Sequence, residues 1–242
     1  ICITTQVGCN IGCSFCASGQ LKKKRDVTVG EMVLQIIQTE RVINEKIDSV
    51  VLMGIGEPFD NYDNTIDFLS ILNHQKGLNI GARKITVSTS GIVPKIIEFA
   101  NLKTQVNLAL SLHAARDEVR SKLMKINNVY SVDKVIDAIK YYLEKTNRRV
   151  TIEYILIDSI NDTKEDAEAL IRLLDGMNVY INLIPYNEVL ETPYKRTPLD
   201  NQKRFLHWIK QGKLDVTLRK EQGHDINAAC GQLRSIQEKK IT

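Results

Sequence analysis

Hydrophobic residues along the chain follow two different spacings. Short apolar runs such as Val50–Met53 are typical of buried strands, whereas apolar residues three and four apart, as in 132–143, predict amphipathic helices. Thr28 and Thr163 each precede an acidic residue by three positions, the pattern of a capping box at a helix start. Strands are expected at 1–7, 50–53, 85–88, 106–112, 150–157, 179–184 and 214–218, and helices behind Thr28 and at about 66–72, 92–101, 132–143, 163–175 and 200–211.

The regular alternation of strands and helices predicts an α/β fold. Consecutive strand–helix units imply a parallel sheet with right-handed crossovers. Six or seven units are too few for a closed eight-unit barrel, so we expect a partial (β/α)6-type barrel with parallel strands, in one domain spanning residues 1–242. A doubly wound open sheet is the alternative. In either fold, the chemistry is expected at the carboxyl ends of the strands.

The composition is that of an ordinary globular chain. Of 242 residues, 43% are apolar and 26% are charged. No run of about 18 apolar residues occurs, so we expect no membrane-spanning segment. The net charge of +4 is a weak sign of an anionic partner, because basic pairs are usually solvated surface. Five cysteines argue against a secreted disulfide scaffold and favour a cytoplasmic location.

Three cysteines near the start of the chain have the spacing of metal ligands. Cys9, Cys13 and Cys16 lie within eight residues, separated by small neighbours. Thiolates suit zinc, copper(I) and iron–sulfur clusters, and a structural zinc site requires a fourth ligand nearby. The next candidate ligand is His74, more than fifty residues later. Three ligands therefore fit a cluster with one open iron, with a structural zinc loop or a redox loop as the alternatives.

Polar motifs at other predicted strand ends suit a small ligand. Gly56 allows close approach of the backbone, and Glu57 can accept from an ammonium group, although glycine is also common in simple turns. Ser88 can bind a carboxylate or a ribose, or it can cap a helix. His113 is equally compatible with a buried structural histidine, and Asn187 with a role in a turn.

The motifs resemble those of a known family. The C-x3-C-x2-C spacing, with Phe15 before the last cysteine, resembles the loop with which radical S-adenosylmethionine (SAM) enzymes hold a 4Fe–4S cluster whose fourth iron is chelated by SAM. Taken together, the motifs are similar to those of the RlmN family of adenine carbon-2 RNA methyltransferases. They comprise Cys2, the cysteine loop, Met53–Pro58, Ser88–Gly91, Ser111–His113, Asn182–Asn187 and Ala228–Leu233.

This resemblance implies a role for each motif. Cys9, Cys13 and Cys16 are the implied cluster ligands, and the implied SAM contacts are Gly56, Glu57, Ser88, Ser111, Leu112, His113 and Asn187. The implied catalytic residues are Cys230, which takes a methyl group from one SAM, and Cys2. A radical derived from a second SAM activates that methyl group for addition to the base. Cys2 then releases the product by forming a disulfide with Cys230, which an external reductant reopens.

The resemblance also implies partners. It predicts an RNA substrate (23S rRNA, possibly tRNA), an electron donor such as flavodoxin, and a monomeric enzyme. We expect the chain to be the catalytic core without the amino-terminal accessory domain, so that the base that removes the carbon-2 proton lies upstream of Ile1.

Three alternatives remain. The related Cfr enzymes methylate carbon 8 of an rRNA adenine and share the cysteines, although Pro58, Ser90 and Pro185 favour the carbon-2 group. A metal-stabilised RNA-binding module would use the cysteines for zinc. A radical SAM enzyme with a small-molecule or protein substrate would leave Cys2 and Cys230 without a role.

Overall fold

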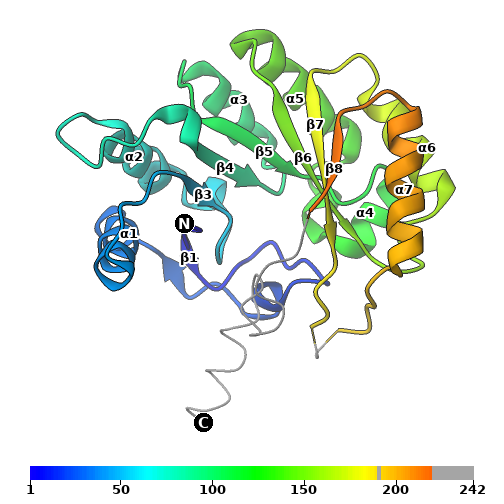
Figure 1. The fold of residues 1–242 in the computed structure, drawn as a ribbon, viewed down its shortest axis with the longest axis horizontal. Coiled ribbons are helices and arrows are strands. Elements are labelled where there is room, and N and C mark those ends of the chain that lie inside the picture. The colour runs from blue at the N-terminus through cyan, green and yellow to red at the C-terminus, as the bar shows by residue number, and fades with distance from the viewer. Residues whose placement is uncertain (190–191, 220–242) are drawn as a thin grey trace.

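A curved parallel sheet of six strands forms the centre of the molecule (Figure 1). The computed structural model describes residues 1–189 and 192–219. The strands follow one another in chain order: β3 (Val50–Leu52), β4 (Ile85–Thr89), β5 (Asn107–Ser111), β6 (Val150–Leu156), β7 (Val179–Pro185) and β8 (Val216–Leu218). Because the order of these described strands never reverses, the sheet has no switch point. The predicted partial (β/α)6 barrel is therefore confirmed, and the doubly wound alternative is wrong.

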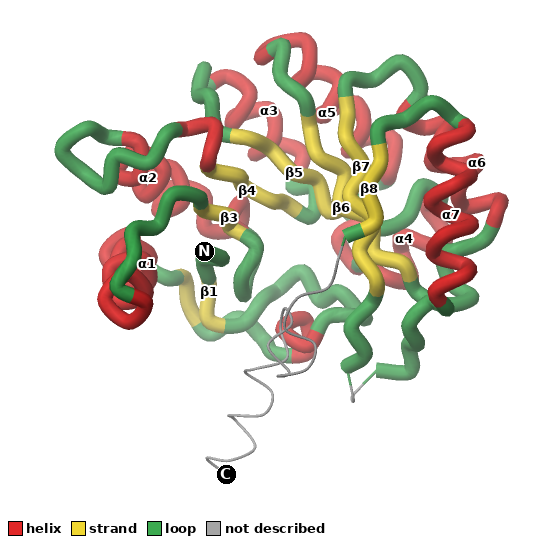
Figure 2. The backbone as a smooth tube through the Cα atoms, viewed as in Figure 1, coloured by secondary structure: helices red, strands yellow, loops and turns green. Residues whose placement is uncertain are grey.

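Helices cover the outer side of the sheet. Figure 2 shows them in red outside the yellow strands, with α1 packed beside α2. The helices are α1 (Val29–Ile43), α2 (Tyr62–Asn73), α3 (Val93–Asn101), α4 (Asp117–Leu123), α5 (Val132–Thr146), α6 (Lys164–Leu174) and α7 (Leu199–Gln211). Both predicted capping boxes are present, at Thr28 with Glu31 and at Thr163 with Asp166. Helix α4 was not predicted, because its seven residues contain only two large apolar side chains.

The two faces of the sheet differ in chemistry. Side chains that face the helices, such as Leu52, Val87 and Ile152, are buried and apolar. Successive side chains in a strand point to opposite faces, so the residues between them line the inner, concave side. These inner positions include Val51, Thr86, Ser88, Ser111, Glu153, Asn182 and Thr217. The interior of the partial barrel is therefore mainly polar.

The amino-terminal segment lies beside the first strand of the sheet. Ile3 donates its N–H to the carbonyl of Val51 at 2.8 Å, and Val51 donates to the carbonyl of Ile1 at 2.9 Å. Gln6–Val7 (β1) then pairs with Arg25–Asp26 (β2) in a small antiparallel sheet around the cysteine loop. The predicted extended start is confirmed. Among the described residues, no helix has the length and apolarity needed to cross a bilayer.

Candidate active site

The predicted functional motifs meet at one edge of the sheet. Gly54–Pro58 follows β3, Ser88–Gly91 ends β4, Ser111–His113 ends β5 and Pro185–Asn187 ends β7. The carboxyl ends of parallel strands lie at the same edge, where (β/α) barrels carry their active sites. We call this edge the mouth of the barrel. Fold topology alone therefore brings four separate sequence motifs to one place.

The cysteine loop is closed by its own backbone. Cys9 donates its N–H to the carbonyl of Leu21 at 3.0 Å, which joins the two arms of the loop. Inside the loop, Cys16 donates to the carbonyl of Cys13 at 3.2 Å, and Gly19 donates to that of Cys16 at 3.0 Å. These bonds hold the three cysteines on one compact turn.

Aromatic side chains fix the cysteine loop to the mouth. The Phe15 ring packs edge-on against the His113 ring with centroids 5.1 Å apart. The Tyr186 hydroxyl, beyond the end of β7, donates to the carbonyl of Phe15 at 3.1 Å. Phe15 thus connects the loop to β5 and β7 at once, which explains why an aromatic residue stands before the last cysteine.

The three thiols suit an iron–sulfur cluster. Burial raises the pKa of Cys9 to about 11, and Cys16 adds to this shift. Burial also raises the pKa of Cys13, with Cys16 and Cys9 as the next causes, so the three sulfurs are electrostatic neighbours. A bound metal reverses this effect, because a coordinating thiol is deprotonated.

A site for a single metal ion differs from a site for a cluster. Among residues 1–189 and 192–219, no three Cys, His, Asp or Glu side chains surround the position of a single metal ion. The ligands of a 4Fe–4S cube bind three different irons and stand farther apart than the ligands of one ion. The lack of a single-ion site among these residues therefore does not count against a cube.

Gly8 has no room for a side chain, which gives a testable prediction. Its φ is +85°, and an added Cβ would lie 2.2 Å from the carbonyl oxygen of Lys22. Gly8→Ala is expected to lower the free energy of unfolding by roughly 2–5 kcal/mol and to reduce cluster content, as measured by urea denaturation and iron analysis. Gly30→Ala in α1, where an added Cβ meets nothing within 4 Å, is the control and should not destabilise the protein. Equal effects of the two changes would contradict this account of the loop.

Glu57 lies buried at the mouth with both oxygens engaged. Its Oε2 accepts from the N–H of Ser90 at 2.7 Å, and its Oε1 accepts from that of Phe59 at 3.0 Å. Burial raises the pKa of Glu57, and these two hydrogen bonds partly oppose the shift. Because each carboxylate oxygen has two lone pairs, capacity for an ammonium group remains. The neighbouring position 56 requires glycine. Gly56 has a φ of +107°, and a Cβ added there would lie 2.6 Å from the Cβ of Gln6.

The remaining predicted SAM contacts lie at or just beyond the carboxyl ends of β4, β5 and β7. The hydroxyls of Ser88 and Ser111 lie 3.3 Å apart on the inner face of β4 and β5. Leu112, the next residue, is fully buried in the apolar core. The Oδ1 of Asn187 is a buried acceptor with no hydrogen-bond partner among the described residues. An orphaned acceptor in this place fits a ligand that donates to it, such as a ribose hydroxyl or an adenine amino group.

His113 is held neutral and in an unusual backbone conformation. Its φ is +59°, a region that costs energy for residues other than glycine. Its Nδ1 accepts from the N–H of Ile155 at 3.1 Å, so the ring carries its proton on Nε2. Burial, followed by the charge of Arg120, lowers the pKa of His113 to about 3. The ring is therefore a neutral donor that packs on the cysteine loop.

Glu153, a buried carboxylate on the inner face of β6, was not among the residues predicted from the sequence. It lies between Ser111 and Asn182 in the register of the sheet, and Asn182 Nδ2 donates to its Oε2 at 2.8 Å. Burial raises the pKa of Glu153, while Asn182 and then Arg219 lower it. The signal was present, since Glu153 is the one acidic residue in the apolar run from Val150 to Ile157.

Gln6 was also missed, although it joins the first two motifs. Its Oε1 accepts from the N–H of Glu57 at 2.9 Å, and its Nε2 donates to Asp26 and Asp60 at 2.8 Å each. Lys23 bridges the same two carboxylates at 2.9 and 3.0 Å. This network connects the strand before the cysteine loop to the Gly-Glu motif.

The described residues include Cys2 but not Cys230. Cys2 forms a parallel β-bridge with Val51, so its side chain is on the inner face of the sheet. Cys2 is also exposed to solvent. That position is compatible with a thiol that reaches the mouth. Cys230 lies outside the described residues, so its role and its disulfide with Cys2 stay predictions.

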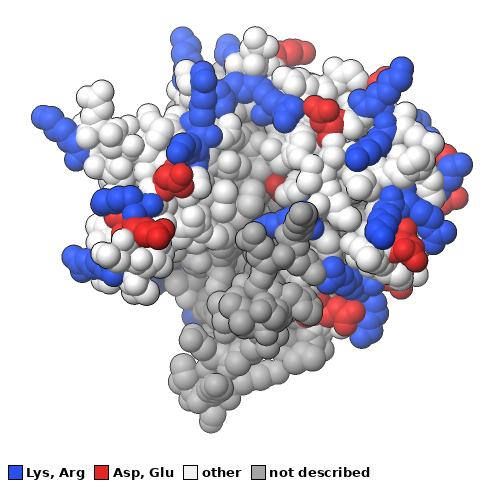
Figure 3. Space-filling model, in the orientation of Figure 1, with Lys and Arg blue, Asp and Glu red and all other residues white. Residues whose placement is uncertain are grey.

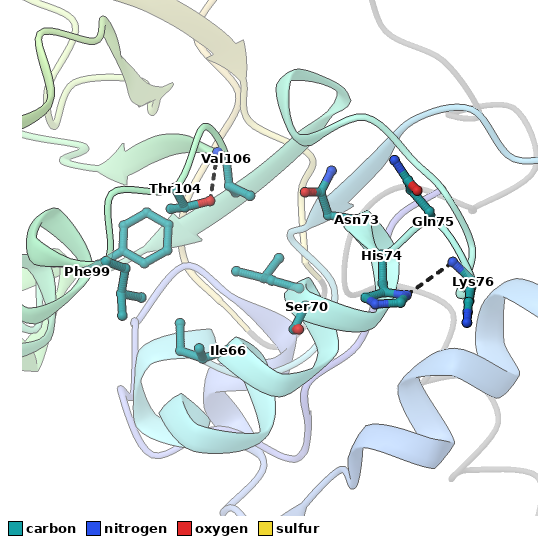
Figure 4. A pocket seen from close by; sticks show the side chains of 11 residues that line it. Ile66, Ser70, Asn73, His74, Gln75, Lys76, Phe99, Thr104 and Val106 are labelled. Carbon is teal, nitrogen blue, oxygen red and sulfur yellow. Dashed lines mark hydrogen bonds between the residues drawn. The ribbon is translucent and has the colours of Figure 1, made fainter.

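A separate pocket of about 740 Å³ lies away from the mouth (Figure 4). Its walls come from α2, from α3 and from Thr104 and Val106 just before β5. It therefore lies at the amino ends of the strands, on the edge opposite the predicted site. Its polar side chains Thr104 and His74 each accept a local backbone N–H, from Val106 and Lys76 respectively.

On the face seen in Figure 3, the basic side chains of the described residues do not mark out an RNA-binding surface. Figure 3 shows Lys and Arg spread over the visible face rather than gathered in one block. Several pair with acidic neighbours, including Lys84 with Asp48 at 3.2 Å and Arg149 with Asp215 at 3.0 Å. An RNA-binding surface therefore stays a prediction.

Comparisons with known proteins identify the family of the chain. The model of the radical SAM superfamily matches residues 3–174. A curated relative from Acholeplasma laidlawii, a probable dual-specificity RNA methyltransferase RlmN, is 65% identical over 97% of this chain and 69% of its own length. A relative of the same name from Spiroplasma citri is 54% identical over 98% of this chain and 69% of its own.

Solved structures give the same result. A radical SAM methyltransferase from Sphaerobacter thermophilus has a TM-score of 0.93 and 44% identity, covering 97% of this chain and 70% of that one. SuiB from Streptococcus suis, solved with SAM bound, has a TM-score of 0.69 at 20% identity, covers 94% of this chain and 51% of that one, and supports the fold alone. The resemblance seen in the motifs is confirmed: the chain belongs to the radical SAM superfamily and, within it, to the RlmN family.

Proposed function

We propose that this chain is a radical SAM RNA methyltransferase that adds a methyl group to carbon 2 of adenosine in 23S rRNA and in tRNA. The observation that carries the proposal is 65% identity, over 97% of the chain, to a probable dual-specificity RNA methyltransferase. The family implies a 4Fe–4S cluster and SAM as cofactors. When bound, the reduced cluster supplies the electron that cleaves SAM.

The residues of the mouth divide this work. Cys9, Cys13 and Cys16 hold the cluster on a loop that Phe15 packs against the strands. Also at the mouth, Glu57 binds the ammonium group of SAM with its remaining lone pairs. Burial of these groups excludes water and strengthens each polar contact.

Ser88, Ser111, Leu112, His113 and Asn187 complete the proposed SAM site. The two serine hydroxyls offer hydrogen bonds from the inner face of the sheet, and Leu112 offers a dry wall. Asn187 supplies the orphaned acceptor. His113 donates from Nε2, because its Nδ1 is already occupied.

The two remaining cysteines explain how an unreactive carbon is methylated. Carbon 2 of adenine has no lone pair, so it cannot attack SAM directly. We propose that Cys230 carries the methyl group to the base and that Cys2, on the inner face of the sheet, attacks the Cys230 sulfur to release the product. The disulfide that results is reopened by a reductant.

The setting of the enzyme follows from this chemistry. Reduced thiols and an oxygen-sensitive cluster favour a cytoplasmic location. An electron donor such as flavodoxin supplies the reducing electron, and we propose that the enzyme works as a monomer.

Nucleoside analysis tests the proposal. The anaerobically reconstituted protein is incubated with reductant, RNA and SAM carrying a deuterated methyl group, and the digested RNA is compared with standards by liquid chromatography and mass spectrometry. A labelled product that co-elutes with 2-methyladenosine supports the proposal. Labelled 8-methyladenosine would assign the chain to Cfr-type chemistry, SAM cleavage without RNA methylation would indicate another substrate class, and a zinc protein indifferent to SAM would leave only RNA binding.

A further inference from the structure

Arg120, in the unpredicted helix α4, is a fully buried cation at the mouth. None of its surface is exposed, although arginine is rarely buried. Its Nε donates to the carbonyl of Leu112 at 3.1 Å, its Nη2 to that of Ser90 at 2.6 Å, and its Nη1 to Asn127 Oδ1 at 2.8 Å. The planar guanidinium thus holds three neighbouring segments in fixed relative positions.

Two of these segments carry the proposed SAM contacts. Ser90 accepts from Arg120 through its carbonyl and donates its N–H to Glu57 at 2.7 Å, so Arg120 supports the Glu57 carboxylate through one peptide unit. Leu112 is itself a proposed contact and precedes His113. A single side chain therefore links the segments that directly follow β4 and β5.

The same helix also holds the cysteine loop. Ser14 donates its N–H to the carbonyl of Leu123 at 2.9 Å and its hydroxyl to that of Lys122 at 3.0 Å, at the end of α4. Cys13, the neighbour of Ser14, lies close enough to interact electrostatically with Arg120. Helix α4 thus connects the cysteine loop to the segments that follow β4 and β5.

The charge of Arg120 needs compensation. Its pKa, lowered to about 10 by burial, keeps it cationic at neutral pH. No carboxylate within the described part of the chain forms an ion pair with it, and the acceptors of its hydrogen bonds are neutral oxygens. A buried cation without an anionic partner is costly. Two negative groups raise the pKa of Arg120: first the Cys13 thiolate, and then Asp117, whose Oδ1 already accepts from Asn127 at 2.7 Å and from the N–H of Val132 at 2.9 Å.

We propose that Arg120 is a positioning residue with two roles. Its planar guanidinium fixes the segments after β4 and β5, which carry proposed SAM contacts, relative to the cysteine loop. Its charge offsets the negative charge of the cysteine-ligated cluster. This inference rests on the proposed function, since it assumes that the cysteines hold a cluster and that SAM binds at the mouth. A cationic neighbour stabilises added negative charge, so it favours the reduced state of such a centre.

Two substitutions separate the roles. Arg120→Lys keeps the charge and loses the fork, so it should weaken SAM binding about tenfold while leaving the reduction potential of the cluster near that of the native protein. Arg120→Met removes the charge as well, so the equilibrium constant for reduction of the cluster should fall at least about tenfold. This corresponds to a reduction potential lower by about 59 mV for one electron. Arg116→Lys is the matched control, because Arg116 precedes the same helix but pairs with Asp166 at 2.8 Å and touches neither loop. It should change neither quantity.

Potentiometric titration and SAM binding to the loaded protein give the result without any RNA assay. Loss of thermal stability with unchanged potential and unchanged SAM affinity in both variants would overturn the inference and leave Arg120 a structural residue. If Arg120→Met does not fold, Arg120→Lys still decides, because native SAM affinity in that variant contradicts the positioning role. A native protein that takes up no cluster or binds no SAM would instead refute the proposed function itself.

Discussion

Replacing Cys13 with alanine is expected to abolish cluster binding and, with it, the cleavage of SAM. Cys13 is the middle one of the three proposed ligands, and its backbone carbonyl also accepts from Cys16 at 3.2 Å. Loss of even an outer-shell partner of a metal ligand lowers metal affinity about 10- to 100-fold, so loss of the ligand itself should cost roughly a hundredfold or more. Iron and sulfide analysis after anaerobic reconstitution, together with the yield of 5′-deoxyadenosine, measures the effect.

Cys2→Ala is the informative control for this experiment. Cys2 lies beside Val51 on β3 rather than in the cysteine loop. The variant should take up iron and cleave SAM as the native chain does, but it should fail to release methylated RNA. Full cluster content in Cys13→Ala, or loss of the cluster in Cys2→Ala, would contradict the assignment of ligands.

Glu57→Gln is expected to weaken SAM binding strongly. The amide has nearly the same size, but it removes the charge that pairs with an ammonium group and puts an NH2 against a backbone donor, Ser90 or Phe59. A hydrogen bond to a charged group contributes about 1.5–3 kcal/mol, which corresponds to roughly a 10- to 150-fold rise in Kd. Equilibrium binding of SAM to the reconstituted protein provides the measurement.

A surface glutamate supplies the comparison for Glu57. Glu98 pairs with Lys95 at 2.6 Å on α3 and is half exposed, so Glu98→Gln should leave SAM affinity unchanged. Unfolding in urea separates binding from stability, because the unsatisfied donor in Glu57→Gln should also destabilise the protein by about 1–3 kcal/mol. A Glu57→Gln protein with native affinity would show that the carboxylate serves the turn alone.

The order of elements was predictable from the sequence because it depends on local patterns. Apolar runs located the strands from β3 to β8 to within a few residues, and the capping boxes at Thr28 and Thr163 located the starts of α1 and α6. The motifs at strand ends were predictable for the same reason, since parallel topology brings strand ends together. The cysteine spacing required no tertiary information at all.

What could not be predicted depends on contacts between distant segments. In the sequence, Arg120 lies in a polar stretch typical of a surface helix, and nothing local indicates that it is buried between Ser90 and Leu112. Gln6 gave no signal either, because its network with Glu57 joins residues about fifty positions apart. The left-handed backbone of His113 likewise results from its tertiary hydrogen bonds. These supports of the site became visible only in the folded chain.

Electron paramagnetic resonance of the reduced, reconstituted protein tests the central claim most directly. If the three cysteines leave one corner of an iron–sulfur cube open at the mouth, the spectrum of the cluster should change when SAM is added and 5′-deoxyadenosine should follow. A protein that holds a single zinc ion, or a cluster whose spectrum is indifferent to SAM, would contradict the account.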